Sequence, residues 1–400
     1  MSIREKIGGI LKQYIMVIIL VAILLIFQIT TSGALLTSVN LFNLVNQNAY
    51  GMILAVGMLI CVLTGGNVDL SVGSLLGFVS ACMATFMTEY GMNTYLAIFL
   101  GLLIGILAGV WQGFWIAYVR VPSFITTLAG MLIFQGGILL VLKGGKTIAP
   151  LPESFNVLAS GYIGTAEASG SICLAVGVMI ALVFVFFQIK NYITRKRNGY
   201  SVNRIGSLLL SCIIVSAVLI WAFAKIAEQR GVPTVLILVG LVALIYYFVT
   251  QKTVIGRHLY ALGGNAKAAK LSGIKTDRIL FLAYVNMSLL AAVAAVAYSA
   301  RMNAAAATAG TGTELDAIGA VFLGGASASG GIGTVGGTLI GALIMGVLNN
   351  GMSIMGLGTD MQQAVKGLVL LAAVAVDVIS KQRTLDPIMN RIRLVFFNRL

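Results

Sequence analysis

The chain has 400 residues, of which 59% are hydrophobic and only 10% are charged, and its formal net charge is +14. A soluble domain carries about a quarter charged residues, so this composition excludes an ordinary water-soluble protein. Apolar runs of about 20 residues, the length that crosses a bilayer as a helix, recur from end to end. We therefore expect an all-α polytopic membrane protein, organised as one permease domain over residues 1–400.

The apolar runs define twelve candidate spans. The first follows a basic start (Arg4, Lys6 and Lys12) and lacks a convincing cleavage site, so we interpret it as a span rather than a signal peptide. The run 315–329 is short and rich in Gly, Ala and Ser, which puts the expected number between 10 and 12. In chain order the spans are 14–29, 41–63, 72–88, 95–118, 122–142, 171–189, 207–225, 234–250, 280–300, 315–329, 334–350 and 361–379.

Lys and Arg residues predict the orientation of these spans. Most of them fall on one side if the N-terminus is cytoplasmic, whereas acidic residues gather on the other side, as the positive-inside rule requires. We expect both termini in the cytoplasm, which needs an even number of crossings and hence a full crossing by 315–329. The positive charge is then a signal of topology, and we expect membrane lipid and no nucleic acid as a partner.

Two glycine-rich segments interrupt the apolar pattern, at Thr64–Ser74 and Gly324–Gly337. Broken helices at corresponding places in two halves of a chain indicate a transport path. Close packing through small residues is the alternative, and Asp69 is also a candidate N-cap for a helix that begins at Leu70.

Polar side chains inside or beside the spans are candidates for contact with a hydroxyl-rich solute, because amides and hydroxyls bind neutral hydroxyl groups without introducing a costly charge. Hydrogen bonding between helices is the alternative for each of them. The candidates for the translocation path are Asn46, Gln47, Asn67, Asp69, Ser71, Ser123, Phe124, Thr127, Gln135, Asn349 and Asn350.

The predicted inner loop 251–279 contains a complete short helix. Asn265 is a good N-cap, Ala266–Ser272 contains strong helix formers, and Gly273 is a natural stop. Gly263 and Gly264 permit a sharp turn before it. An isolated helix of two turns is marginal in water, so we expect a cytoplasmic partner to hold it, with contact to anionic lipid as the alternative.

Several classes of function lack the residues they need. Gly145-Lys146-Thr147 ends like a phosphate-binding loop, but Leu140 stands where its first glycine belongs, so we expect no ATP binding by this chain. We find no catalytic constellation and expect neither enzymatic activity nor a cofactor. An ion-coupled carrier would bury carboxylates, yet Asp69 is the only acid near the middle of the apolar sequence, and Lys366 has no obvious partner.

Five sequence motifs, spread along the chain, resemble those of one transporter family. TGGNVDLSVGSL (64–75), VPSFITTLAGML (121–132), ELDAIGAVFLGGASASGGIGTVGGTLIGA (314–342), LNNGMSIMGL (348–357) and the loop GRHLYALGGNAKAAKLSGI (256–274) are similar, in order, to ATP-binding-cassette importer permeases for monosaccharides. The resemblance covers about residues 40–380. The helix pair 171–225 looks like an addition found in the xylose and multiple-monosaccharide branch, and Ser327-Ala328-Ser329 departs from the Ser-Leu-Ala frequent in the family.

The resemblance implies a mechanism. Two copies of such a permease line the path in a bacterial inner membrane, a cytoplasmic ATPase subunit binds ATP, and an extracytoplasmic protein delivers the sugar. Xylose or several sugars would be the substrate. The ATPase would dock on the loop at Gly256, Arg257, Tyr260, Gly263, Gly264, Asn265, Ala268, Ala269, Leu271, Ser272 and Gly273. The alternative function is a stand-alone secondary carrier or facilitator.

Overall fold

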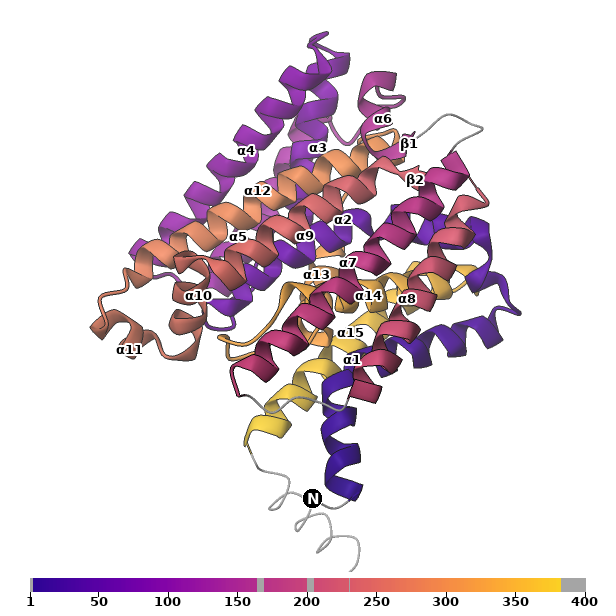
Figure 1. The fold of residues 1–400 in the computed structure, drawn as a ribbon. Coiled ribbons are helices and arrows are strands. Elements are labelled where there is room, and N and C mark those ends of the chain that lie inside the picture. Colours follow the sequence, from indigo (N-terminus) through magenta and orange to yellow (C-terminus); the bar gives the residue numbers. More distant parts are fainter. Residues whose placement is uncertain (1–2, 164–168, 200–204, 230, 383–400) are drawn as a thin grey trace, which may run out of the picture.

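The computed structural model describes residues 3–163, 169–199, 205–229 and 231–382. It is a bundle of long helices with a two-stranded ribbon at one side (Figure 1). The predicted cytoplasmic residues Arg204, Arg383, Arg391, Arg393 and Arg399 lie outside the described residues. The elements are α1 (Ile3–Thr30), η1 (Ala34–Leu36), α2 (Ser38–Leu63), α3 (Val72–Thr88), α4 (Thr94–Phe114), η2 (Trp115–Val119), α5 (Ser123–Val141), α6 (Glu153–Ser160), β1 (Tyr162–Ile163), α7 (Ser169–Arg197), α8 (Ile205–Ala227), β2 (Val232–Pro233), α9 (Thr234–Lys252), α10 (Val254–Gly264), α11 (Ala266–Leu271), α12 (Thr276–Met302), α13 (Thr313–Leu323), α14 (Val335–Ile354) and α15 (Thr359–Gln382).

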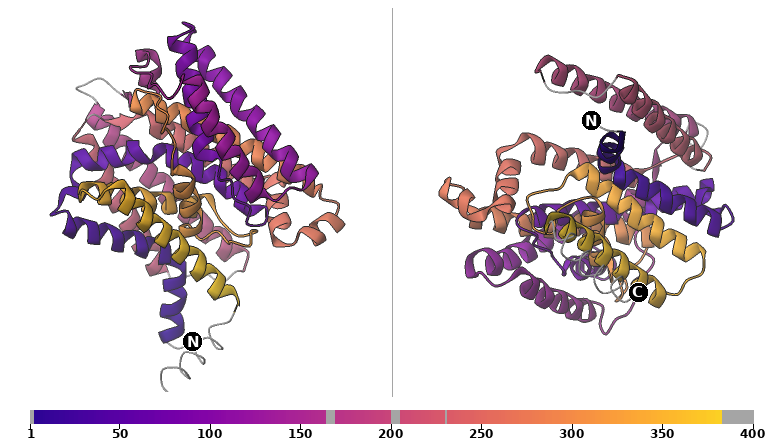
Figure 2. Two further views of the ribbon diagram at one scale, coloured as in Figure 1. Left: turned by 180° about the vertical axis from the view of Figure 1, so that it is seen from behind. Right: turned by 90° about the horizontal axis from the view of Figure 1, so that it is seen from below.

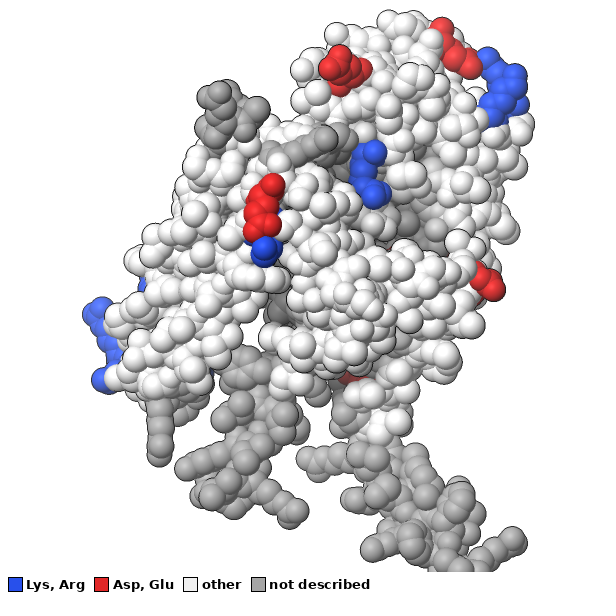
Figure 3. Space-filling model, turned by 90° about the vertical axis from the view of Figure 1, so that its right-hand side faces the viewer, with Lys and Arg blue, Asp and Glu red and all other residues white. Residues whose placement is uncertain are grey.

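The polytopic membrane fold is confirmed. Within the described part of the chain, nine helices are long and apolar enough to cross a membrane, and Met16–Thr30 and Val72–Thr88 are shorter apolar helices. Every predicted span other than 315–329 coincides with one of these helices. The outer surface is correspondingly poor in charge, as the broad uncharged face in Figure 3 shows.

The core of the bundle is α2, with α12, α13 and α14 packed around it. The apolar windows of α2 and α14 are 72% and 67% buried, whereas that of α15 has no buried residue. A helix that is apolar all round and buried belongs in the middle of a bundle, and a helix that is apolar but exposed faces lipid. The bundle therefore has a buried centre and a surface that is apolar because its solvent is lipid.

Close packing of α4 on α12 depends on three glycines spaced one turn apart, Gly105, Gly109 and Gly113. A Cβ atom added at Gly105 would lie 2.6 Å from the Cβ of Ala292, and one added at Gly109 would lie 2.7 Å from the Cα of Val285. Small residues at this spacing let two helices meet backbone to backbone, where dispersion contacts replace the hydrophobic effect that lipid cannot supply.

The predicted span 315–329 is wrong as a continuous helix. Helix α13 has 11 residues, about 16 Å of the roughly 30 Å that a hydrocarbon core requires. The chain before it is extended or turned from Asn303 to Gly312, and Ala305 pairs with Ile148. After α13 the chain is irregular again up to Thr334, so the stretch between α12 and α14 is helical only in its middle.

Two peripheral units flank the core. Helices α7 and α8 pack mainly on each other as a hairpin, at the edge of the bundle in the view from below (Figure 2), which fits the predicted extra pair 171–225. Helices α10 and α11 project at one end (Figure 1). We name this the inner end, because the positive-inside rule predicts that it faces the cytoplasm, and the opposite end the outer end.

The stripe on α4 supplies a stability test. We expect Gly109→Ala to lower the thermal unfolding temperature in detergent, because its Cβ meets backbone atoms of α12 and overpacking costs about 1–3 kcal/mol. Gly136→Ala is the matched control, since no atom lies within 4 Å of a Cβ there and alanine favours a helix by up to about 1 kcal/mol. Equal unfolding temperatures for both variants would contradict the packing.

Candidate functional site

Both glycine-rich breaks meet the projecting helix α10 at the inner end. We call this contact the glycine junction, and it consists of Leu63–Gly66, Gly263–Gly264 and Ala328–Gly333. The N–H of Gly331 donates to the Leu63 carbonyl at 3.1 Å. A Cβ added at Gly263 would lie 1.9 Å from that carbonyl oxygen and 2.3 Å from the Gly331 nitrogen. Three segments far apart in sequence therefore touch through their backbones.

Glycine is required at the junction for conformation as well as space. Gly66 has φ +76° and Gly331 has φ +71°, in the left-handed region that other residues rarely adopt. The hydroxyl of Tyr260 on α10 also donates to the Gly333 carbonyl at 2.8 Å. The sequence singled out each of the three segments, but nothing in it indicated that they touch.

A first polar cluster, the inner polar cluster, lies beside the junction. Asp69 is fully buried and its carboxylate accepts from the Ser71 N–H at 2.9 Å and the Ser71 hydroxyl at 2.7 Å. The Gln112 amide donates to the Ser71 hydroxyl oxygen at 2.6 Å. The predicted N-cap role of Asp69 is wrong in detail, because α3 begins at Val72 and the carboxylate instead closes a turn just before that helix.

Other predicted path residues extend the inner polar cluster. Ser123 donates to the side-chain oxygen of Asn67 at 3.0 Å, and the buried Thr127 donates to the Ser123 carbonyl at 2.9 Å. Gln112 was missed by sequence reasoning. The signal was present, since it is a polar residue inside the apolar run 95–118 and directly precedes a glycine of the α4 stripe.

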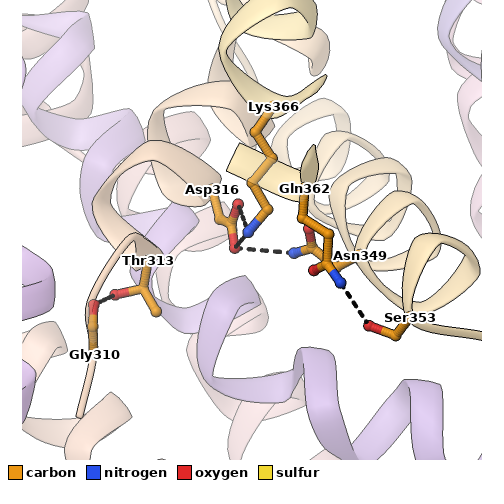
Figure 4. Close-up of polar contacts among 7 residues, drawn as sticks. All are labelled: Gly310, Thr313, Asp316, Asn349, Ser353, Gln362 and Lys366. Carbon is orange, nitrogen blue, oxygen red and sulfur yellow. Dashed lines mark hydrogen bonds and ion pairs between the residues drawn. The ribbon is translucent and has the colours of Figure 1, made fainter. Parts of the chain in front are cut away.

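A second polar cluster, the outer polar pocket, lies between α2, α13 and α14, and Lys366 of α15 contacts its edge. Lys366 pairs with Asp316 at 3.0 Å, and the Asn349 amide donates to the same carboxylate at 2.9 Å (Figure 4). The pocket is also lined by Gln47, Asn48 and Tyr50 of α2. Lys366 thus has the partner that its sequence context did not reveal, because Asp316 lies 50 residues away on a half-length helix.

The outer polar pocket is narrow. Its free space is about 30 Å³. A pentose or hexose does not fit such a space. In the structure the polar groups beside the pocket contact one another, as the bonds of Asp316 to Lys366 and Asn349 show.

The remaining predicted path residues are dispersed. Phe124 and Gln135 are exposed on α5, Asn46 donates to the Phe42 carbonyl one turn earlier, and Asn350 exchanges hydrogen bonds with Asn40 at 2.8 and 3.0 Å. Of the predicted set, only Gln47 and Asn349 line the outer polar pocket. Their side chains share no single cavity with the inner polar cluster.

The predicted inner helix is α11, and its caps have the predicted chemistry. The Asn265 side chain accepts from the Ala268 N–H at 3.0 Å, and Gly273 has φ +84° after the helix. The chain turns at Asn265 rather than at Gly263-Gly264, since both glycines belong to α10. The prediction missed α10 itself, whose buried Leu259 and Leu262 hold it against the bundle.

Exposure divides the predicted docking residues into two groups. Gly256 and Ala269 are buried, and Tyr260 and Gly263 contact the glycine junction. The exposed group is Arg257, Gly264, Asn265, Ala268, Leu271, Ser272 and Gly273. Leu271 is 90% exposed, the largest value among the exposed large apolar side chains of the described residues. Its position at the tip of a projecting helix marks a surface that a partner can cover.

The chain resembles known proteins over most of its length. Residues 40–374 match the family described as "Branched-chain amino acid transport system / permease component". The xylose transport system permease protein XylH of Escherichia coli is 39% identical over 94% of this chain and 93% of that protein. XylH of Haemophilus influenzae is 36% identical over 93% and 98%, respectively.

A second group of relatives is named for another sugar. The ribose import permease protein RbsC of Escherichia coli is 33% identical over 92% of both chains. RbsC of Bacillus subtilis is 35% identical over 94% of both. No solved structure matches the chain. The chain is a polytopic helical bundle, and its family match spans residues 40–374. It therefore belongs to the family of transport-system permease components.

Proposed function

We propose that this chain is the membrane-spanning permease subunit of an ATP-driven importer of monosaccharides, with xylose and ribose as the first candidates. The main support for this proposal is the similarity to xylose and ribose permeases, which extends over nearly the whole length of this chain and of those proteins. Similarity of this extent covers the bundle, the glycine junction and the projecting helices together. The chain then acts as a transport subunit rather than an enzyme, in the inner membrane of a bacterium.

Helices α10 and α11 support docking of a separate ATPase subunit. They present Leu271 and several basic residues at one end of the bundle, while Gly263 and Tyr260 fasten them to both glycine breaks. Force applied to α11 therefore reaches the breaks through rigid backbone contacts. ATP binds to the partner, and an extracytoplasmic sugar-binding protein delivers the solute at the outer end.

Pairing of two permease copies is supported by the surface of α5. Gln135 is exposed on that helix between apolar residues that face lipid. A side-chain amide in hydrocarbon lacks hydrogen-bond partners and is costly there. A second copy covering α5 would bury Gln135 together with Phe124, which places two predicted path residues at the contact.

One observation also favours the alternative function of a stand-alone carrier. Such a carrier needs a titratable group within the bundle, and the Asp316–Lys366 pair is one. This candidate predicts transport by the chain alone, whereas the importer requires its partner subunits.

Measuring sugar uptake into vesicles distinguishes the importer from the stand-alone carrier. We expect the purified chain alone to give no xylose or ribose uptake, and uptake to begin when the ATPase, the sugar-binding protein and ATP are supplied. Radiolabelled sugar trapped in the vesicles measures both. Uptake by the chain alone, driven by an ion gradient, would contradict the importer and favour the carrier.

Docking can be tested at Leu271. We expect Leu271→Glu to weaken ATPase binding to the detergent-solubilised permease at least tenfold, because a charge would replace a 90% exposed apolar side chain at the proposed contact. Leu271→Met keeps an apolar side chain of similar volume and is the control. Unchanged affinity of the glutamate variant would place the ATPase elsewhere.

Coupling can be tested at Gly263. We expect Gly263→Ala to lower the sugar transported per ATP hydrolysed several-fold, because its Cβ would force α10 away from Leu63 and Gly331. Gly240→Ala on α9, outside the junction and the proposed docking surface, should keep the wild-type ratio, since no atom of the chain lies within 4 Å of a Cβ there. The coupling role of the junction is refuted if both variants transport with the same ratio.

A further inference from the structure

The outer polar pocket lies beside a partly buried ion pair that joins α13 and α15. The Lys366 and Asp316 side chains are 16% and 18% exposed, whereas the surface pair Lys143–Glu89 is 64% and 37% exposed. Lys366 lies about 10 Å along α15 from its first residue, and Asn349 about 8 Å from the last residue of α14. Both positions are well inside the outer end of the bundle.

An ion pair that is partly removed from solvent is a poor way to stabilise a bundle. Replacing such a pair by apolar side chains of similar volume is often neutral or stabilising, whereas removing one partner leaves a costly charge. Charges inside membrane helices are accordingly associated with solute paths and relays. Lys366 is carried by α15, whose apolar window has no buried residue, so its departure would uncover little buried surface.

Two acceptor atoms at the pocket have no hydrogen bond of good geometry among the described residues. The Asn349 side-chain oxygen is buried without a hydrogen-bond partner among the described residues. The Asp316 Oδ1 atom contacts Lys366 at 3.0 Å but makes no hydrogen bond of good geometry within the same residues. Gln47 and Asn48 add amide groups on the facing helix. This combination of a carboxylate and amides matches a ligand with several hydroxyl groups, which donate to carboxylates and exchange hydrogen bonds with amides.

We propose that Asp316 and Asn349 bind the hydroxyl groups of the transported sugar, and that Lys366 occupies the carboxylate when no sugar is present. The inference rests on the proposed function and adds a site to it. Lys366 neutralises the partly buried carboxylate while the free space of the pocket, about 30 Å³, is too small for a sugar. The sugar enters when α15 moves Lys366 away, and the carboxylate then exchanges one set of donors for another.

The test uses the complete assembly of permease, ATPase and sugar-binding protein in vesicles, with D-xylose and ribose as probes. The variants are Asp316→Asn, Lys366→Met and the double variant, and the matched controls are Glu89→Gln and Lys143→Met at the exposed pair. Sugar uptake, ATP hydrolysis stimulated by loaded binding protein, and thermal unfolding of the permease are measured for each.

We expect Asp316→Asn to reduce sugar uptake at least tenfold while stimulated ATP hydrolysis continues. The double variant should recover thermal stability, because no unpaired charge remains, but should keep the defect in uptake. Both control variants should transport normally. If the pair binds substrate, the double variant recovers thermal stability but not sugar uptake. If the pair is purely structural, both properties recover together.

Two results would overturn the inference. Wild-type uptake by Asp316→Asn would show that the carboxylate does not bind sugar, and recovery of uptake by the double variant would show that the pair is only structural. A wild-type assembly that hydrolyses ATP but carries neither sugar would instead refute the proposed function, and this inference with it.

Discussion

Hydrocarbon offers no hydrogen bonds to the peptide backbone, and the architecture of this chain follows from that constraint. Helices satisfy it within each span, but the two glycine-rich breaks cannot. They satisfy it by packing against each other, as the Gly331 N–H bonded to the Leu63 carbonyl illustrates. Glycine makes this possible, because a Cβ at Gly66 would lie 1.9 Å from the Ala328 carbonyl oxygen. Loss of helical structure at these points is therefore paired with close tertiary contact.

The same constraint connects the inner end with the outer polar pocket. Helix α13 begins beside the pocket and leads directly into the second break. Helix α15 contacts both ends of this segment, because Lys366 pairs with Asp316 and the Asp377 carboxylate accepts from the Ala328 N–H at 2.9 Å. Its attachment thus includes charged anchors as well as partly buried apolar residues such as Val365 and Val369. A displacement of the second break has a short physical route to Asp316.

Sequence patterns predict well what depends on local properties. Spans follow from the length of apolar runs, and the caps of α11 follow from Asn265 and Gly273, because each depends on neighbouring residues alone. The span 315–329 was wrong because average hydropathy does not register that small residues at 324–334 pack as irregular chain. Partners far apart in sequence were beyond such patterns. Lys366 looked unpaired, and Gly263 looked like a hinge, until tertiary structure brought Asp316 and Leu63 beside them.

The exposure of Leu271 also has a consequence for the isolated chain. A chain without the partner proposed above keeps this apolar side chain in contact with solvent. A partner docked on α11 would cover it. The accessibility of Leu271 would therefore differ between unassembled and assembled chains.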